Sequence, residues 1–233
     1  MQTLIGLGAV LFGYILGSIP FGLLIVRIKT GRDIREIESG RTGGTNAMRA
    51  AGFGAGLLTA IMDIMKGAAA VWAAQGLIPE IHLFHVLAPI GAILGHNYSV
   101  FLIRRDEDGK VRFHGGAGGA PALGGAVGLW CWSFPIVFGL GAVVFFSLGM
   151  ASVTTMAVAF FVTIIFAIRA YMGLMPWTDV LFGVIAEILL MWALRPNVRK
   201  LLAGNERVVK YSLNGWLRAR KEARAEANNV NSG

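Results

Sequence analysis

One segment of the sequence, residues 39–49, combines glycines with hydroxyl, amide and guanidinium side chains. The glycines leave the backbone free to turn its N–H groups onto an anion, and Ser39, Thr45 and Asn46 add further donors. Arg49 can bind a phosphate through two parallel hydrogen bonds. The segment therefore predicts a phosphate site. The alternative is an ordinary basic loop in which Thr45 or Asn46 caps the next helix.

A second glycine-rich segment, residues 114–121, follows a run of charged residues. Backbone N–H groups of Gly115, Gly116 and Gly118 could hold phosphate oxygens at the start of a helix. His114 could act as a general base near neutral pH, or be a solvated loop histidine. The segment lacks the lysine and hydroxyl residue of a nucleotide-binding loop, and close packing of small residues between membrane helices is the alternative.

Two further groups of polar residues border or interrupt apolar stretches. Residues 195–207 begin where an apolar run ends and contain Arg195 and Asn197, so they predict either part of a site or a basic patch that binds anionic lipid. Asp63 and Lys66 stand three residues apart and share a helix face within an apolar run. Charges in such a place pair or line a polar cavity, so they form a structural salt bridge, a wall of the site or part of a transport pathway.

The composition indicates a membrane protein. Of the 233 residues, 55% are hydrophobic and 15% are charged, which is too apolar for a soluble domain. The single cysteine excludes an intrachain disulfide, and the four histidines lack the spacing of a zinc-binding helix, so no metal or cofactor is expected. The net charge of +8 suits a partner surface made of phosphates.

The apolar runs are long enough for several membrane crossings. The uncharged run Leu4–Val26 predicts one transmembrane helix. The run 120–150 is too long for one crossing, and Ser133-Phe134-Pro135 at its centre can end one helix and start another. Other runs cover residues 52–78, 83–103, 152–168 and 177–194. The predicted fold class is therefore an all-α integral membrane protein with about seven transmembrane helices.

The basic residues predict the orientation of these helices. Nineteen of the 21 Lys and Arg residues fall in three groups, at residues 27–49, 104–112 and 195–224. Loop Lys and Arg residues stay cytoplasmic, so the crossings must be odd in number, with the N-terminus outside and the C-terminus inside. The active face is then cytoplasmic. Residues 1–210 form a single membrane domain, and 211–233 form a basic cytoplasmic tail that is expected to be an amphipathic helix fraying into disorder from Asn228.

Taken together, these segments resemble the PlsY family, bacterial membrane acyltransferases that use acyl phosphate and glycerol 3-phosphate. The matches to family motifs, in chain order, are Gly17-Ser18-Ile19-Pro20-Phe21-Gly22; Ser39-Gly40 with Gly43, Thr45, Asn46 and Arg49; Asp63-Ile64-Met65-Lys66-Gly67; Gly95-His96 with Val100-Phe101; Ser152; and Asn197 with Gly204 and Glu206. No single match is specific, but their order and spacing are.

The resemblance implies acyl transfer that gives lysophosphatidic acid, at the plasma membrane of a bacterium and without a metal. Ser39, Arg49, Ser152 and Asn197 are implied as catalytic residues. Residues implied to bind substrate phosphate are Gly40, Thr45, Asn46, Gly115, Gly116, Gly118 and Arg195. The donor phosphate itself is implied to accept the hydroxyl proton. The partners are the two substrates and membrane lipids, and we expect a monomer.

The chain also departs from the family pattern. The glycine-loop lysine is replaced by Ala117, a C-terminal histidine by Leu194, and an asparagine after Ser-Gly by Arg41. About a dozen mostly charged residues precede the glycine loop, and we hypothesise that Lys110 or Arg112 folds back to restore the lost charge. The competing function is a non-catalytic relative that binds or moves lipid. Nucleic-acid binding is excluded because the basic residues lack interleaved aromatics.

Overall fold

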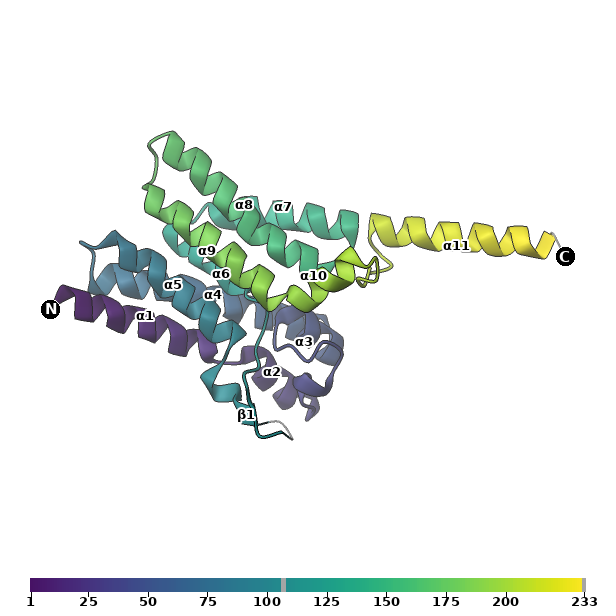
Figure 1. The fold of residues 1–233 in the computed structure, drawn as a ribbon, viewed down its shortest axis with the longest axis horizontal. Helices are drawn as coiled ribbons and strands as arrows, with labels where there is room; N and C mark the ends of the chain where they lie inside the picture. The colour runs from purple at the N-terminus through teal and green to yellow at the C-terminus, as the bar shows by residue number, and fades with distance from the viewer. Residues whose placement is uncertain (106–107, 232–233) are drawn as a thin grey trace.

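The computed structural model describes residues 1–105 and 108–231, and helices make up most of it (Figure 1). The α-helices are α1 (Gln2–Ser18), α2 (Phe21–Thr30), α3 (Gly44–Ala51), α4 (Phe53–Leu77), α5 (His82–Asn97), α6 (Gly119–Leu129), α7 (Ser133–Leu148), α8 (Ala151–Tyr171), α9 (Trp177–Ala193), α10 (Arg195–Leu202) and α11 (Leu213–Asn231). Two 3-10 turns, Ile34–Glu36 and Val100–Leu102, and a hairpin of β1 (Arg104–Arg105) and β2 (Val111–Arg112) complete the described elements.

Within the described residues, three helical segments are long and apolar enough to cross a membrane: residues 2–30, α4 and α8. A fourth is possible if α9 and α10, which meet at a bend of 72°, form one broken span, whereas α6 and α7 are shorter apolar helices. The surface fits an apolar solvent, because many large side chains point outward, Leu11, Phe12 and Phe138 among them. These features support the predicted all-α membrane fold.

Two proline positions decide where helices break. The run Leu4–Val26, predicted as one helix, is divided into α1 and α2 at Ile19–Pro20, because proline has no N–H to continue the hydrogen-bond ladder. The predicted division of the run 120–150 is confirmed: α6 ends at Leu129, and α7 begins at Ser133 with a proline in its first turn. The exposed Cys131 lies in the short connection between these two helices.

Small residues let the central helices approach closely. Ala9, Ala70, Ala74, Ala88 and Ala92 form a buried seam between α1, α4 and α5. Beside it, a side chain at Gly17 of α1 would overlap the backbone carbonyl of Ala92 on α5. In membrane proteins such contacts replace the hydrophobic effect as the force that joins helices. The larger core, formed by α5 to α9, has Phe166 and Phe182 at its centre.

We predict that Gly17→Ala destabilises the protein by about 1–3 kcal/mol, because the added methyl group has to push α1 away from α5. The measurement is thermal unfolding in detergent. Gly8→Ala is the matched control on the same helix, since nothing lies within 4 Å of a side chain placed there. Equal melting temperatures for the two variants would contradict this account of the seam.

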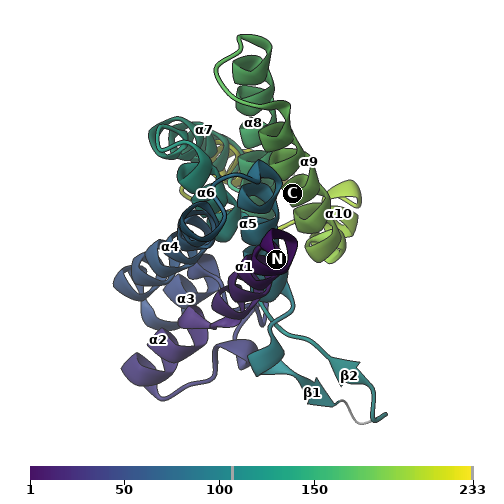
Figure 2. The same ribbon diagram turned by 90° about the vertical axis from the view of Figure 1, so that its left-hand side faces the viewer.

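The hairpin and the last helix project from the helical bundle. Arg104 pairs with Arg112 and Arg105 with Val111, and Figure 2 shows β1 and β2 extending away from the helices. Helix α11 extends beyond the end of α7 (Figure 1) and continues to Asn231. The predicted tail helix is therefore present and extends into the region where fraying was expected, whereas residues 232–233 lie outside the described residues.

Candidate phosphate-binding site

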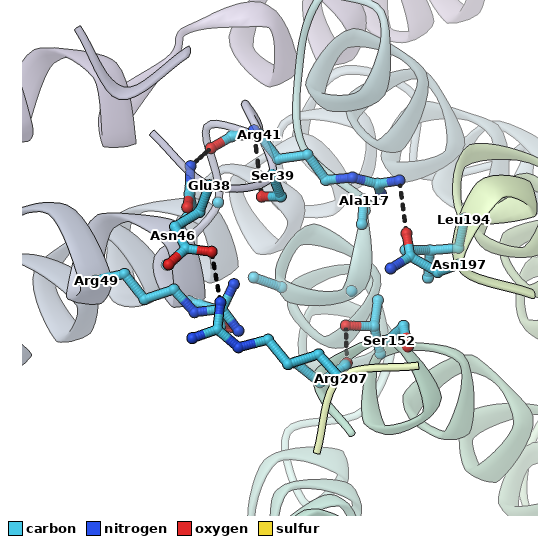
Figure 3. A pocket seen from close by; sticks show the side chains of 18 of the residues that line it. Glu38, Ser39, Arg41, Asn46, Arg49, Ala117, Ser152, Leu194, Asn197 and Arg207 are labelled. Carbon is cyan, nitrogen blue, oxygen red and sulfur yellow. Dashed lines mark hydrogen bonds and ion pairs between the residues drawn. The ribbon is translucent and has the colours of Figure 1, made fainter. Parts of the chain in front are cut away.

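A cavity of about 390 Å³ opens at the end of the bundle where four helices begin (Figure 3). Its wall includes Gly44 and Thr45 of α3, Gly119 and Ala120 of α6, Ala151 and Ser152 of α8, and Asn197 of α10. The N–H groups in the first turn of a helix have no partner within that helix, and the helix dipole places partial positive charge there. Four helix N-termini around one cavity favour an anion.

Glycine and proline residues that end the preceding segments bring these helix starts together. Gly43 stands before α3 and Gly118, with φ of 88°, before α6. Pro196 occupies the first turn of α10, where its missing N–H costs nothing, and the 72° bend after α9 turns Asn197 toward the cavity. Helices α3, α6 and α10 therefore begin at the cavity because a local breaker ends the preceding segment there.

Basic side chains outnumber free carboxylates at the cavity wall. Arg41, Arg49, Lys200 and Arg207 line it. The carboxylates in the wall are those of Glu38, Glu206 and Asp63, and Asp63 pairs with Lys66 at 2.9 Å. In the described part of the chain the cavity thus carries an excess of positive charge, which a phosphate would neutralise.

Arg49 and Arg207 form a basic cluster in the cavity wall. Arg207 donates to Glu38 in an ion pair, as Figure 3 shows beside Arg49. Burial lowers the pKa of the Arg49 guanidinium, and the nearby charge of Arg207 lowers it further. The carboxylates of Glu38 and Glu206 act in the opposite direction and offset part of the repulsion between the two guanidinium groups. An anion placed between them would relieve this repulsion.

Arg41 reaches the cavity from the loop before α3. Its Nη2 donates to the carbonyl oxygen of Ala193 at 3.0 Å and to Oδ1 of Asn197 at 3.1 Å, at the end of α9 and the start of α10. Burial lowers the pKa of the Arg41 guanidinium, while the charge of Glu206 acts in the opposite direction. Arg41 therefore ties two distant segments together with its charge facing the cavity.

Glu206 positions the polar side chains beside the Arg41 guanidinium. Its Oε1 accepts from the Ser152 hydroxyl at 2.5 Å and from the Asn197 amide at 3.1 Å, and the residue is buried. Because Asn197 uses its nitrogen toward Glu206 and its oxygen toward Arg41, the amide orientation is fixed. The carboxylate thereby positions Ser152, Asn197 and, through Asn197, Arg41.

We expect Glu206→Ala to lower the activity proposed below by about 10- to 100-fold, because Ser152 and Asn197 lose their common acceptor and Arg41 loses the support of a fixed Asn197. Glu206→Gln retains one acceptor oxygen and should lose less. The measurement is the initial rate of product formation at saturating substrates. A Glu206→Ala variant as active as the unmodified protein would remove the positioning role.

The buried pair Asp63 and Lys66 lies behind this cavity on α4. Lys66 Nζ contacts Asp63 Oδ1 at 2.9 Å, His96 Nδ1 at 2.8 Å and the carbonyl oxygen of Ile19 at 3.2 Å. Both charged side chains are almost completely shielded from solvent, and Asp63 and His96 also line the cavity. The pair is therefore a salt bridge, and only its Asp63 member lies in the cavity wall. The sequence had left both of these roles open alongside a transport pathway.

The structure brings together many of the residues predicted from sequence. The cavity is lined by Ser39, Thr45, Asn46, Arg49, Gly118, Ser152, Asn197 and Asp63. Asn46 nevertheless needs a correction, because its side-chain nitrogen already donates to the carbonyls of Ile34, Ile37 and Arg41. That nitrogen shapes the loop before α3 and has no hydrogen left for a phosphate.

The glycine loop before α6 also differs from the prediction. The Gly116 N–H donates to the His96 carbonyl oxygen, and a side chain at Gly115 or Gly116 would overlap His96. These two glycines permit close packing against the end of α5, and neither lines the cavity. The part of this segment that faces the cavity runs from Ala117 to Ala120.

Several predicted binding residues lie away from the cavity. Arg195 is exposed, its guanidinium carbon lies 4.7 Å from the ring centroid of Trp192, and it donates to the Trp192 carbonyl oxygen.

The segment before α6 also holds predicted residues that do not reach the cavity. The backbone carbonyl of His114 accepts from the Ser99 N–H, and the His114 side chain is not in the cavity wall. Lys110 and Arg112 are exposed on the projecting hairpin (Figure 2) and do not line the cavity, so this structure does not support the hypothesis that they restore the lost charge. Gly40 and Lys66 also lie outside the wall.

Sequence reasoning left five charged cavity residues out of the predicted site: Glu38, Arg41, Lys200, Glu206 and Arg207. Arg41 was noted only as a departure from the family pattern, although it replaces one polar residue by a longer, charged one. Glu206 had a signal, since it belongs to the matched C-terminal motif. Lys200 and Arg207 follow a bend that the sequence does not show, and nothing in the pattern separates them from neighbouring basic residues.

Comparison with known proteins identifies relatives of the whole chain. Residues 7–204 match the family model described as glycerol-3-phosphate acyltransferase. Relatives named glycerol-3-phosphate acyltransferase from Mesorhizobium japonicum and Rubrobacter xylanophilus are each 36% identical over 198 residues, or 85% of this chain and 93% and 92% of theirs. A crystal structure of PlsY, titled an integral membrane glycerol 3-phosphate acyltransferase in its glycerol 3-phosphate form, superposes with a TM-score of 0.76 at 27% identity, covering 88% of this chain and 95% of that one.

Proposed function

The chain belongs to the glycerol-3-phosphate acyltransferase family of integral membrane proteins, and from this premise we propose that it transfers a fatty acyl group from an acyl phosphate to the sn-1 hydroxyl of glycerol 3-phosphate. The product is lysophosphatidic acid. The single observation that carries the proposal is the excess of positive charge, together with four helix N-termini, around one cavity. Both substrates present a phosphate to such a cavity.

The proposal includes an arrangement in the membrane. Seven crossings, made by the α1–α2 pair, α4, α5, α6, α7, α8 and α9, place the N-terminus outside and the C-terminus inside. All four helix starts at the cavity then lie on the cytoplasmic side of a bacterial plasma membrane. We also propose that the chain acts as a monomer.

The reaction needs no nucleophile from the protein. The oxygen of the acceptor hydroxyl attacks the acyl carbonyl carbon, and the bond from that carbon to the phosphate oxygen breaks. The leaving phosphate takes the hydroxyl proton, so atoms and charge balance without a protein base. The protein aligns the two substrates and stabilises negative charge on the leaving group.

The cavity offers a separate place for each phosphate. Arg49 and Arg207, with Lys200 in the same wall, form its more open basic side, and Arg207 is 58% exposed. We place glycerol 3-phosphate there, because it arrives from water and is polar throughout. Ser152, near the start of α8 and hydrogen-bonded to Glu206, lies where it can orient the reacting groups.

The test is a direct assay of the purified protein in detergent or vesicles. Radiolabelled glycerol 3-phosphate and palmitoyl phosphate should give labelled lysophosphatidic acid, and omission of palmitoyl phosphate should abolish it. Palmitoyl coenzyme A and palmitoyl acyl carrier protein, supplied in its place, test the donor. Product from either thioester but not from acyl phosphate would overturn the choice of donor, and absence of product from all three would favour the non-catalytic lipid-binding alternative.

A further inference from the structure

Arg41 has one donor group that the protein does not use. Its Nη2 bonds to Ala193 and Asn197, but Nη1 is shielded from solvent and has no hydrogen-bond partner among the described residues. The guanidinium group stays charged in proteins, so a buried donor without an acceptor costs free energy. Because Arg41 also lines the cavity, the missing acceptor is expected to be a ligand there.

The nearest carboxylate does not neutralise Arg41 directly. Glu206 accepts from Ser152 and Asn197, and Asn197 stands between Glu206 and Arg41. The carboxylate thus fixes the amide that holds Arg41 in place. Figure 3 shows the side chain extending from its loop toward Asn197, so the guanidinium reaches the side of the cavity away from the Arg49 and Arg207 cluster.

The surroundings of Arg41 distinguish the two substrates. It is anchored to Ala193, the last residue of α9, and the buried apolar side chain of Leu194 lines the cavity beside this anchor. The acyl chain of the donor must extend out of the cavity along an apolar helix, whereas glycerol 3-phosphate has no apolar part. An arginine at the end of such a helix is therefore placed for the phosphate of the acylated substrate.

We propose that Arg41 binds the phosphoryl group of the acyl donor and stabilises it as it leaves. This inference rests on the proposed function and assigns one of its two phosphates to one residue. A guanidinium group at this position supplies the positive charge that the glycine loop lacks, since Ala117 lines the same cavity with only a methyl group.

The test compares Arg41→Ala, Arg41→Lys and the double variant Arg41→Ala/Ala117→Lys. We expect Arg41→Ala to lower kcat/KM for palmitoyl phosphate by about 100-fold, as for loss of one preorganised charged donor, and to leave KM for glycerol 3-phosphate within about twofold. Inhibition by inorganic phosphate, competing with palmitoyl phosphate, should weaken by about tenfold. Arg195→Ala is the matched control, because this arginine is exposed outside the cavity at the start of α10 and should retain activity.

The double variant Arg41→Ala/Ala117→Lys separates a loss of binding from a loss of folding. A lysine at position 117 enters the same cavity from another segment, so recovery of about tenfold in kcat/KM over Arg41→Ala identifies the charge itself as the contribution. A rise in KM for glycerol 3-phosphate alone would overturn the assignment. Unchanged inhibition by inorganic phosphate in Arg41→Ala would also overturn it. The same holds if the Arg41→Lys and double variants fold but have a kcat/KM for palmitoyl phosphate no higher than that of Arg41→Ala. If the unmodified protein makes no product from acyl phosphate, the proposed function fails instead.

Discussion

Replacing Arg49 with alanine is expected to lower kcat/KM for glycerol 3-phosphate by about 10²- to 10³-fold. Arg49 lines the cavity, and in the described structure no protein acceptor takes a hydrogen bond from its guanidinium group. Its neighbour Arg207 is already paired with Glu38 and cannot take over its role. The loss should appear as a higher KM for glycerol 3-phosphate together with a lower kcat, measured with the radiolabelled acceptor.

Arg49→Lys provides the internal comparison for this result. Lysine keeps the charge but loses the planar pair of donors, so an intermediate loss of activity is expected. Arg195→Ala, outside the cavity on α10, should behave as the unmodified protein does. Retention of more than half of the activity by a folded Arg49→Ala variant would show that the acceptor phosphate binds elsewhere.

Replacing Lys66 with methionine is expected to destabilise the protein by about 3–5 kcal/mol, the largest stability effect that we foresee. The substitution leaves Asp63, which is 1% exposed, as an uncompensated charge between packed helices. It also removes the bonds from Lys66 to His96 and to the Ile19 carbonyl, which link α4 to α5 and to the break between α1 and α2. Thermal or denaturant unfolding in a mild detergent would measure the loss.

The double variant Asp63→Leu/Lys66→Met removes both charges and is the matched control. A buried ion pair replaced by apolar side chains of similar size costs little, so this variant should recover much of the lost stability. A double variant that is less stable than Lys66→Met would contradict the ion-pair explanation and would indicate that packing or the bond to His96 dominates.

The sequence was sufficient for the all-α fold and for many residues of the cavity wall, but it missed the break between α1 and α2 and could not tell what each donor contacts. Asn46 has the residue type of a phosphate ligand, yet its amide is occupied by three carbonyls of the preceding turn. Gly115 and Gly116 have the pattern of a phosphate loop, yet they pack on His96. In each case the competing partner belongs to a backbone that only the folded chain brings near.

For the basic residues, too, the sequence does not reveal which contacts the folded chain creates. Arg41 reaches an asparagine 156 positions away, a contact that no local pattern encodes. Arg195 is at the start of the same helix as that asparagine, but it lies on Trp192 outside the cavity. Residue type and spacing therefore placed positive charge at the correct end of the bundle and could not say which side chains face inward.

The lone thiol of Cys131, exposed between α6 and α7, is a natural reporter of sidedness. With seven crossings this connection faces the outside of the cell, opposite the substrate cavity. A membrane-impermeant maleimide added to intact cells should then label the protein without any engineered cysteine. Because the chain has no other cysteine, every labelled molecule reports the orientation of that one connection.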